Sequence, residues 1–226
     1  MKFTQRSYEK ELLDGTGIPF AAIERNMKEL NTINTLLGGH AITIKGFRQL
    51  ATGNHCHICE IGCGGGDNLL AIAKSSKAPL HITGIDLNAA CIQVAATTLK
   101  NYQPVLLVSN YKNVEWKTDV PDIVFSSLFC HHFTDEEMVS QLQWMQQHCS
   151  KGFFINDLHR HWLAYYSIKW LTALFSKSYL VKNDAPLSVR RGFRRNEWKE
   201  LLEQAGIKNY AIQWKWAFRW LIIVHK

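Results

Sequence analysis

The sequence lacks any apolar run long enough to cross a bilayer, which excludes a membrane-spanning helix. Internal repeats and low-complexity segments are also lacking. The first ten residues are polar and charged, so we expect no secretory signal peptide there. Basic residues form no long block, since the densest run is Arg190, Arg191, Arg194 and Arg195. We therefore expect a cytoplasmic protein without stable membrane insertion. Its net charge of +7 is expected to reflect a solvated surface or an anionic substrate rather than nucleic-acid binding.

The spacing of the cysteines and histidines argues against a zinc site. His55, Cys56, His57 and Cys59 resemble a metal cluster, but in a strand these side chains alternate between the two faces. A structural zinc site would also need a second, distant pair of ligands. We predict no metal ligands, and we expect reduced core thiols at Cys56, Cys59, Cys63, Cys91, Cys130 and Cys149.

From His57 onward, apolar strand candidates alternate with helical stretches, which is typical of a parallel sheet with right-handed crossovers. The strand candidates are His57–Ile61, Leu80–Ile85, Pro104–Val108, Ile123–Ser126 and Gly152–Asn156. Helical patterns between them include Asn68–Lys74 and Asn88–Lys100. A chain of 226 residues with 46% hydrophobic content can form one α/β domain with a large core, but two would be cramped.

Four segments of this single domain differ in pattern. Residues 1–50 have helical periodicity and are predicted to form a helical lid. Residues 51–156 are predicted to form the core of alternating strands and helices. Residues 157–198 are an aromatic helical insert after the fifth strand. Residues 199–226 are predicted as a closing helix and a β-hairpin at the sheet edge.

A glycine cluster lies between the first strand and the helix after it, where residues 58–67 read Ile-Cys-Glu-Ile-Gly-Cys-Gly-Gly-Gly-Asp. Glycines there let backbone approach a ligand closely, and the helix start presents free N–H groups. Asp86 ends the second strand, 20 residues after Gly66, where a carboxylate can accept both hydroxyls of a ribose. A dinucleotide fingerprint needs a glycine where this chain has Asp67, whose charge would repel a pyrophosphate. The pattern therefore favours a nucleoside without phosphate.

This glycine loop with Glu60 before it and Asp86 after the next strand resembles class I S-adenosylmethionine-dependent methyltransferases, over about residues 45–160. The resemblance implies a Rossmann-like, mostly parallel seven-stranded sheet with an antiparallel last strand. In that family the glycine loop surrounds the methionine portion of S-adenosylmethionine, and the acid binds the ribose. The cofactor-binding positions that the resemblance implies are Glu60, Gly62, Cys63, Gly64, Gly66, Asp86, Leu87, Asn110, Tyr111 and Ser127.

Histidines follow the fourth and fifth strands, at the sheet edge where open α/β folds bind ligands. A hydroxyl acceptor needs a base, and an imidazole titrates near neutral pH. We therefore predict His132 or His159 as the base; the structural alternative is that these rings only shape their loops. The predicted acceptor contacts are His131, Arg160, Tyr165 and Arg190.

The insert 157–198 and the run Leu36-Leu37-Gly38-Gly39 are similar to a bacterial branch of small-molecule methyltransferases found near quinone biosynthesis or type III polyketide synthases. That resemblance implies a small hydrophobic or aromatic acceptor, such as a phenolic or polyketide-like hydroxyl in secondary metabolism. C-methylation of a quinone precursor is the alternative. RNA methylation is disfavoured because no Asn-Pro-Pro-Tyr-type loop follows the fourth strand, and a non-catalytic cofactor-binding subunit has less support. The chain would act as a monomer or homodimer.

Overall fold

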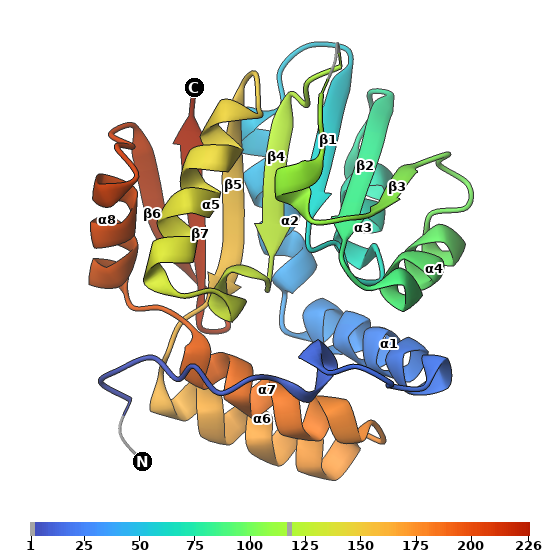
Figure 1. Cartoon of the computed structure of the whole chain (residues 1–226), viewed down its shortest axis with the longest axis vertical. Helices are drawn as coiled ribbons and strands as arrows, with labels where there is room; N and C mark the ends of the chain where they lie inside the picture. Colours follow the sequence, from blue (N-terminus) through green and yellow to red (C-terminus); the bar gives the residue numbers. More distant parts are fainter. Residues whose placement is uncertain (1–2, 117–118) are drawn as a thin grey trace.

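A seven-stranded sheet forms the centre of the computed structural model, which describes residues 3–116 and 119–226 (Figure 1). The strand order is β3-β2-β1-β4-β5-β7-β6; β1 to β5 are parallel, and β7 runs antiparallel to both of its neighbours. The strands are β1 (Cys56–Ile61), β2 (Leu80–Asp86), β3 (Val105–Val108), β4 (Ile123–Ser127), β5 (Gly152–Leu158), β6 (Tyr210–Lys215) and β7 (Arg219–His225). The predicted Rossmann-like sheet with an antiparallel last strand is confirmed.

Helices cover both faces of the sheet. They are α1 (Phe20–Leu36), α2 (Gly39–Leu50), α3 (Asp67–Ser75), α4 (Ala89–Thr98), α5 (Asp135–Gln147), α6 (Trp162–Phe175), α7 (Tyr179–Arg191) and α8 (Arg195–Gln204). Side chains of α2, α3 and α4 pack on one face with Phe125 and Phe154 of the strands. Those of α5 and α8 pack on the other face with Phe153 and Ile155. Alternate residues of one strand thus enter different cores, as the period of two requires.

The helices α1, α6 and α7 lie together beyond the carboxyl ends of the parallel strands, as Figure 1 shows at the bottom of the view. The N-terminal segment crosses this region before α1 and includes a short 3-10 helix, η1 (Leu12–Asp14). Across both described ranges, no helix is long and apolar enough to cross a membrane. The six cysteines are all buried and unpaired, in agreement with core thiols.

Two segment boundaries from the sequence differ from the structure. β5 continues to Leu158, so Asp157 belongs to the sheet rather than to the insert. The insert ends inside α8, which begins at Arg195. Within the predicted lid, α2 packs on the sheet, while η1 and α1 contact the insert through α7. Residues 1–2 of the lid and 117–118 of the predicted core lie outside the described residues.

Gly46 sets how closely α2 approaches the sheet. A methyl group at Gly46 would lie 2.5 Å from the ring of Phe154, which stacks on Phe125. We expect Gly46→Ala to lower the free energy of unfolding by about 1–3 kcal/mol through overpacking, despite the better helix propensity of alanine. Urea unfolding followed by circular dichroism measures this change. In the control Ala41→Gly, on the exposed side of α2, only the propensity loss of about 1 kcal/mol should appear. An unchanged Gly46→Ala variant would contradict the tight contact.

Candidate cofactor and acceptor site

A cavity of about 1310 Å³ lies at the carboxyl ends of the parallel strands. Its walls come from η1, α1, the glycine loop after β1, the turn after β2, the loop after β4, and the helices α6 and α7. Open α/β sheets bind ligands at this edge, where the strand order reverses between β1 and β4. The cavity therefore joins the predicted cofactor loop to the predicted insert.

The glycine loop needs glycine at Gly62 for two reasons. Its φ of +67° is in the left-handed region, and a Cβ atom there would overlap the ring of Phe129. The backbone N–H groups of Gly62 and Cys63 donate to the carbonyl of Ile85, at distances of 2.8 and 3.1 Å. These contacts hold the loop against the end of β2 and leave the backbone beyond Gly62 facing the cavity.

Asp86 joins the glycine loop to the start of α4. One carboxylate oxygen accepts the N–H of Gly64 at 2.9 Å, and the other accepts the N–H of Asn88 at 2.8 Å. Burial raises the pKa of Asp86, while these two backbone donors oppose the rise. An ionised carboxylate has about four acceptor sites, so Asp86 can still accept hydroxyl donors from the cavity that it borders.

Two buried groups of opposite charge border the same cavity with unpaired polar atoms. Both carboxylate oxygens of Glu60 lack a partner among the described residues, and so does one guanidinium nitrogen, Nη1, of Arg219. The other, Nη2, donates to Asn34 at 2.8 Å. Burial raises the pKa of Glu60 well above its usual value, with the nearby Asp67 and Asp86 adding to the rise. A buried acid without a partner and a guanidinium with one free nitrogen suit the ammonium and carboxylate of an amino acid.

The predicted cofactor positions are almost all brought together. Those that border the cavity are Glu60, Gly62, Cys63, Gly64, Asp86, Leu87, Asn110, Tyr111 and Ser127. Gly66 does not border it, because it starts α3 with a φ of +75° and packs against Ala95 and Leu99. Arg219 was missed by the sequence analysis, which treated the closing hairpin only as a sheet edge.

His131, in the loop after β4, is fully enclosed between two carboxylates. Its Nδ1 lies 2.8 Å from Asp157, and its Nε2 lies 3.4 Å from Glu11. Asp157 also accepts the backbone N–H of Cys130 at 2.8 Å. These carboxylates outweigh the effect of burial and raise the pKa of His131 to about 9, so the ring is a cation at neutral pH. The acids respond in the opposite direction, and the pKa values of Glu11 and Asp157 are lowered.

His132 is the imidazole of this loop that remains open to the cavity. Its side chain is 21% exposed, its Nδ1 lies 3.2 Å from Asp14, and its Nε2 lies 3.7 Å from Glu11. Neither contact has hydrogen-bond geometry in this arrangement, so the ring is flanked by carboxylates without being locked by them.

The acids Glu11 and Asp14 reach the histidines because α7 holds the N-terminal segment in place. The carboxylate of Asp184 accepts the N–H groups of Leu12 and Leu13 at 2.8 and 3.0 Å. The hydroxyl of Ser188 donates to Glu11 at 2.7 Å. Glu11 and Asp14 carried no sequence signal, because they lie far from the histidines along the chain and in no recognisable motif.

His159 lies outside the cavity, which corrects its prediction as a base. Its ring packs against Trp220, with centroids 4.9 Å apart, and accepts a hydrogen bond from Trp214 Nε1 at 3.3 Å. Burial and neighbouring positive charges lower the pKa of His159 to about 4. The half-buried ring thus packs against the closing hairpin, and His159 does not line the cavity.

Three predicted acceptor contacts also face other parts of the protein. Arg160 is buried and paired with Glu197, and Arg190 pairs with Glu9 at 3.2 Å. Tyr165 is buried and packs edge-on against an aromatic ring of the N-terminal segment. None of the three borders the cavity. Instead, each of them contacts the N-terminal segment and so connects the insert to it. His131 borders the cavity, but both its ring nitrogens face carboxylates.

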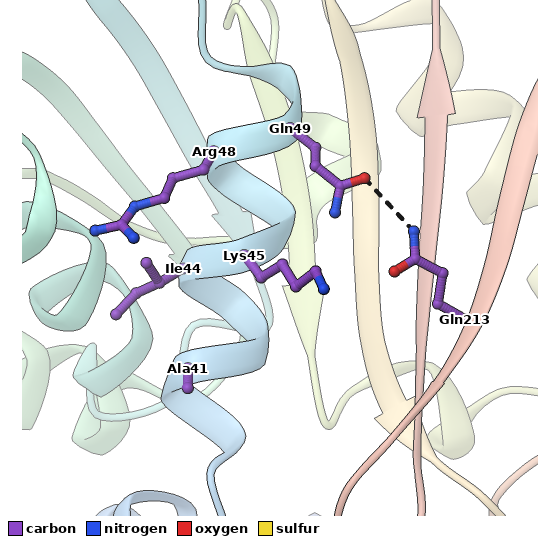
Figure 2. Close-up of a pocket in the computed structure, with 6 residues that line it drawn as sticks. All are labelled: Ala41, Ile44, Lys45, Arg48, Gln49 and Gln213. Carbon is purple, nitrogen blue, oxygen red and sulfur yellow. Dashed lines mark hydrogen bonds between the residues drawn. The ribbon is translucent and has the colours of Figure 1, made fainter.

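A second hollow of about 770 Å³ lies elsewhere, between α2 and the edge strand β6. Its lining residues, shown in Figure 2, are Ala41, Ile44, Lys45, Arg48, Gln49 and Gln213. A 3.5 Å hydrogen bond from Gln213 to Gln49 crosses it (Figure 2). These side chains include no carboxylate, imidazole or thiol, and the predicted cofactor positions border the larger cavity instead.

Known proteins that are similar to this chain in sequence or in fold include methyltransferases. Residues 58–152 match the family model of a methyltransferase domain. Solved structures share the fold: human N-acetylserotonin methyltransferase in complex with SAM has a TM-score of 0.65 at 17% identity, covering 92% of this chain and 56% of that one. A SAM-dependent methyltransferase from Aquifex aeolicus also has a TM-score of 0.65, at 12% identity, covering 92% of this chain and 99% of its own.

A third structure with this fold, the plantazolicin methyltransferase BpumL in complex with a monoazolic desmethylPZN analog and SAH, has a TM-score of 0.62 at 20% identity. It covers 85% of this chain and 72% of its own. No curated protein sequence matches the chain significantly. Residues 58–152 therefore resemble a methyltransferase domain, and the chain has a Rossmann-like class I methyltransferase fold. The matched domain and the crystallised neighbours agree with the predicted cofactor, S-adenosylmethionine.

The raised pKa of His131 predicts how stability depends on pH. Because the pKa of His131 is higher in the folded than in the unfolded chain, its protonation stabilises the fold. The full contribution is present below the pKa of the unfolded chain, and it is lost as the pH rises through the pKa of the folded chain. We expect the free energy of unfolding to fall by about 2 kcal/mol between about pH 6.5 and pH 8.5. Urea titrations at several pH values measure the slope.

The slope should vanish in His131→Gln, which removes the titrating ring. It should persist in the matched variant His159→Gln, because the lowered pKa of His159 affects stability only at more acidic pH. A wild-type slope in His131→Gln would show that His131 is not held as a cation.

Proposed function

We propose that this chain is an S-adenosylmethionine-dependent methyltransferase that acts on a hydroxyl group of a small hydrophobic acceptor of phenolic or polyketide-like character. The observation that carries the proposal is the single cavity shared by the glycine loop, the insert and His132. A cofactor and an acceptor could lie in contact there, with an imidazole beside them. One similar structure is named for N-acetylserotonin, which is in keeping with a small acceptor.

The cofactor end of the cavity fits S-adenosylmethionine better than a nucleotide. Glu60 and Arg219 would receive the ammonium and carboxylate of its methionine portion, which would pair both buried groups. Asp86 would accept the ribose hydroxyls. Three acidic side chains, those of Glu60, Asp67 and Asp86, border this end and make it a poor site for a pyrophosphate. When bound, the cofactor supplies an electrophilic methyl group on a sulfonium.

The acceptor end is mostly apolar. Its lining from the end of β5, α6 and α7 includes Leu158, Ala164, Ile168, Leu171, Val181 and Val189. Such a wall would hold an aromatic or alkyl body by burial of apolar surface. The hydroxyl to be methylated would then face the polar side of the cavity, where His132 and its two carboxylates lie.

We assign the role of general base to His132 rather than to His131. His131 already carries a proton at neutral pH, since its pKa is about 9, and its Nδ1 is hydrogen-bonded to the buried carboxylate of Asp157. A phenol has a pKa of about 10, so little phenolate exists at neutral pH without a base. His132 would accept the phenol proton as the methyl group moves, and Asp14 and Glu11 would stabilise the resulting imidazolium.

Substitution of Asp86 tests the cofactor site. We expect Asp86→Ala to weaken S-adenosylmethionine binding by about 1.5–3 kcal/mol, roughly 10- to 150-fold in Kd, through loss of hydrogen bonds to a charged group. Isothermal titration calorimetry measures the affinity. Because Asp86 also holds Gly64, circular dichroism must show that the variant is folded. Binding at wild-type affinity in a folded variant would place the ribose elsewhere.

Substitution of the two histidines tests the base. We expect His132→Ala to lower kcat by at least about 100-fold while cofactor affinity stays near wild type. His159→Ala is the matched control and should retain turnover, because His159 lies outside the cavity. Transfer of labelled methyl to a panel of phenols and quinols provides the readout. If His132→Ala turns over at the wild-type rate at saturating acceptor, O-methylation with this base is wrong, and C-methylation of a quinone precursor becomes the better proposal.

A further inference from the structure

The helix α6 exposes an unusual row of large apolar side chains, which we call its outer face: Trp162, Leu163, Tyr166, Trp170 and Leu174. Each is between 43% and 72% exposed. At about 100° per residue, the five fall within an arc of roughly 120° on one side of the helix. The next residue, Phe175, is 77% exposed. Contiguous exposed apolar surface of this kind on a folded domain marks an interaction site.

The opposite side of α6 belongs to the acceptor end of the cavity. Ala164, Ile168 and Leu171 line the cavity and lie on the side of the helix away from the outer face. Figure 1 shows α6 at the edge of the molecule farthest from the sheet, alongside α7. The helix therefore separates the cavity from whatever covers the outer face.

The charged residues in the segment that carries this face are all basic. Residues 162–182 contain Lys169, Lys177 and Lys182 and no acidic residue, and all three lysines are exposed. Glu29 of α1 approaches the end of α6, but its carboxylate accepts backbone N–H groups there, including that of Lys177 at 3.0 Å. The whole chain carries a net charge of +7. An apolar stripe with tryptophan and tyrosine, flanked by lysines, has the composition of a helix that lies in a membrane interface.

We propose that the outer face of α6 docks the protein on an anionic lipid bilayer. The aromatic and leucine side chains would enter the headgroup region, and the lysines would approach the anionic headgroups. With 14 residues, α6 is too short to span the membrane and would lie along its surface. A second copy of the chain fits this face less well, because its lysines would meet lysines of like charge.

Docking in this position would put the insert side of the acceptor cavity next to the lipid. A hydrophobic acceptor dissolved in the bilayer could then pass α6 into the cavity without crossing water. This consequence depends on the proposed methyltransferase function, whereas docking itself does not. Lipid binding can therefore be tested without cofactor or acceptor.

Co-sedimentation of the full chain with vesicles tests the proposal. We expect binding to vesicles of equal parts phosphatidylcholine and phosphatidylglycerol, much weaker binding to phosphatidylcholine alone, and a decrease with added salt. The double variant Trp170→Ser/Leu174→Ser should lower the partition coefficient by roughly tenfold or more. Lys169→Glu/Lys177→Glu should lower it by a similar factor on the anionic vesicles only.

Leu36→Ser is the matched control, because Leu36 at the end of α1 is 75% exposed, close to the 72% of Leu174. It should bind vesicles like the wild type, and circular dichroism should show all variants folded. Wild-type protein that stays in the supernatant with anionic vesicles would overturn the proposal. So would equal binding by Trp170→Ser/Leu174→Ser. A wild-type dimer that this double variant dissociates, without vesicle binding, would assign the outer face to self-association and also overturn it.

Discussion

The buried pair of Asp157 and His131 is the interaction on which the cavity depends. Asp157 lies one residue before the end of β5 with no exposure to solvent, and an isolated carboxylate there would be strongly destabilising. It is ionised only because His131 carries the opposite charge and the N–H of Cys130 donates to it. That cation in turn attracts Glu11, which brings the N-terminal segment across the carboxyl ends of the strands. Loss of one charge would therefore loosen the sheet edge, the loop after β4 and the lid together.

The fold and the cofactor end could be predicted because their signals are local. Alternating apolar strands and helices imply a parallel sheet, and a parallel sheet places every strand's carboxyl end at one edge. The sequence alone therefore predicts that the glycine loop after β1, Asp86 at the end of β2 and Ser127 at the end of β4 lie close together. Gly66 was the exception, because a glycine that starts a helix and packs on its neighbour looks the same in sequence as one that faces a ligand.

The acceptor end could not be predicted in the same way, because its contacts join residues that are distant in the chain. Ending the fifth strand at Asn156 placed His159 in a free loop, whereas β5 continues to Leu158 and the following backbone bonds to Phe218 and Phe193 of other segments. Arg160 and Arg190 looked like contacts for an anion, but their charges are neutralised by Glu197 and Glu9. Charge content alone does not show whether an arginine faces a ligand or a carboxylate of the same chain.

The helix α6 shows how one addition to the common fold can have two roles. A helix that is apolar on most of its circumference is stable in water only when most of that surface is covered. In this chain the inner side of α6 packs against α7 and lines the cavity, whereas its outer face is exposed. Charged residues in place of the outer aromatic side chains would remove the exposed apolar surface without changing the lining of the cavity, since other residues form that lining. Their presence therefore requires a reason outside the folded chain, and a lipid surface that also dissolves the acceptor supplies one for both sides of the helix.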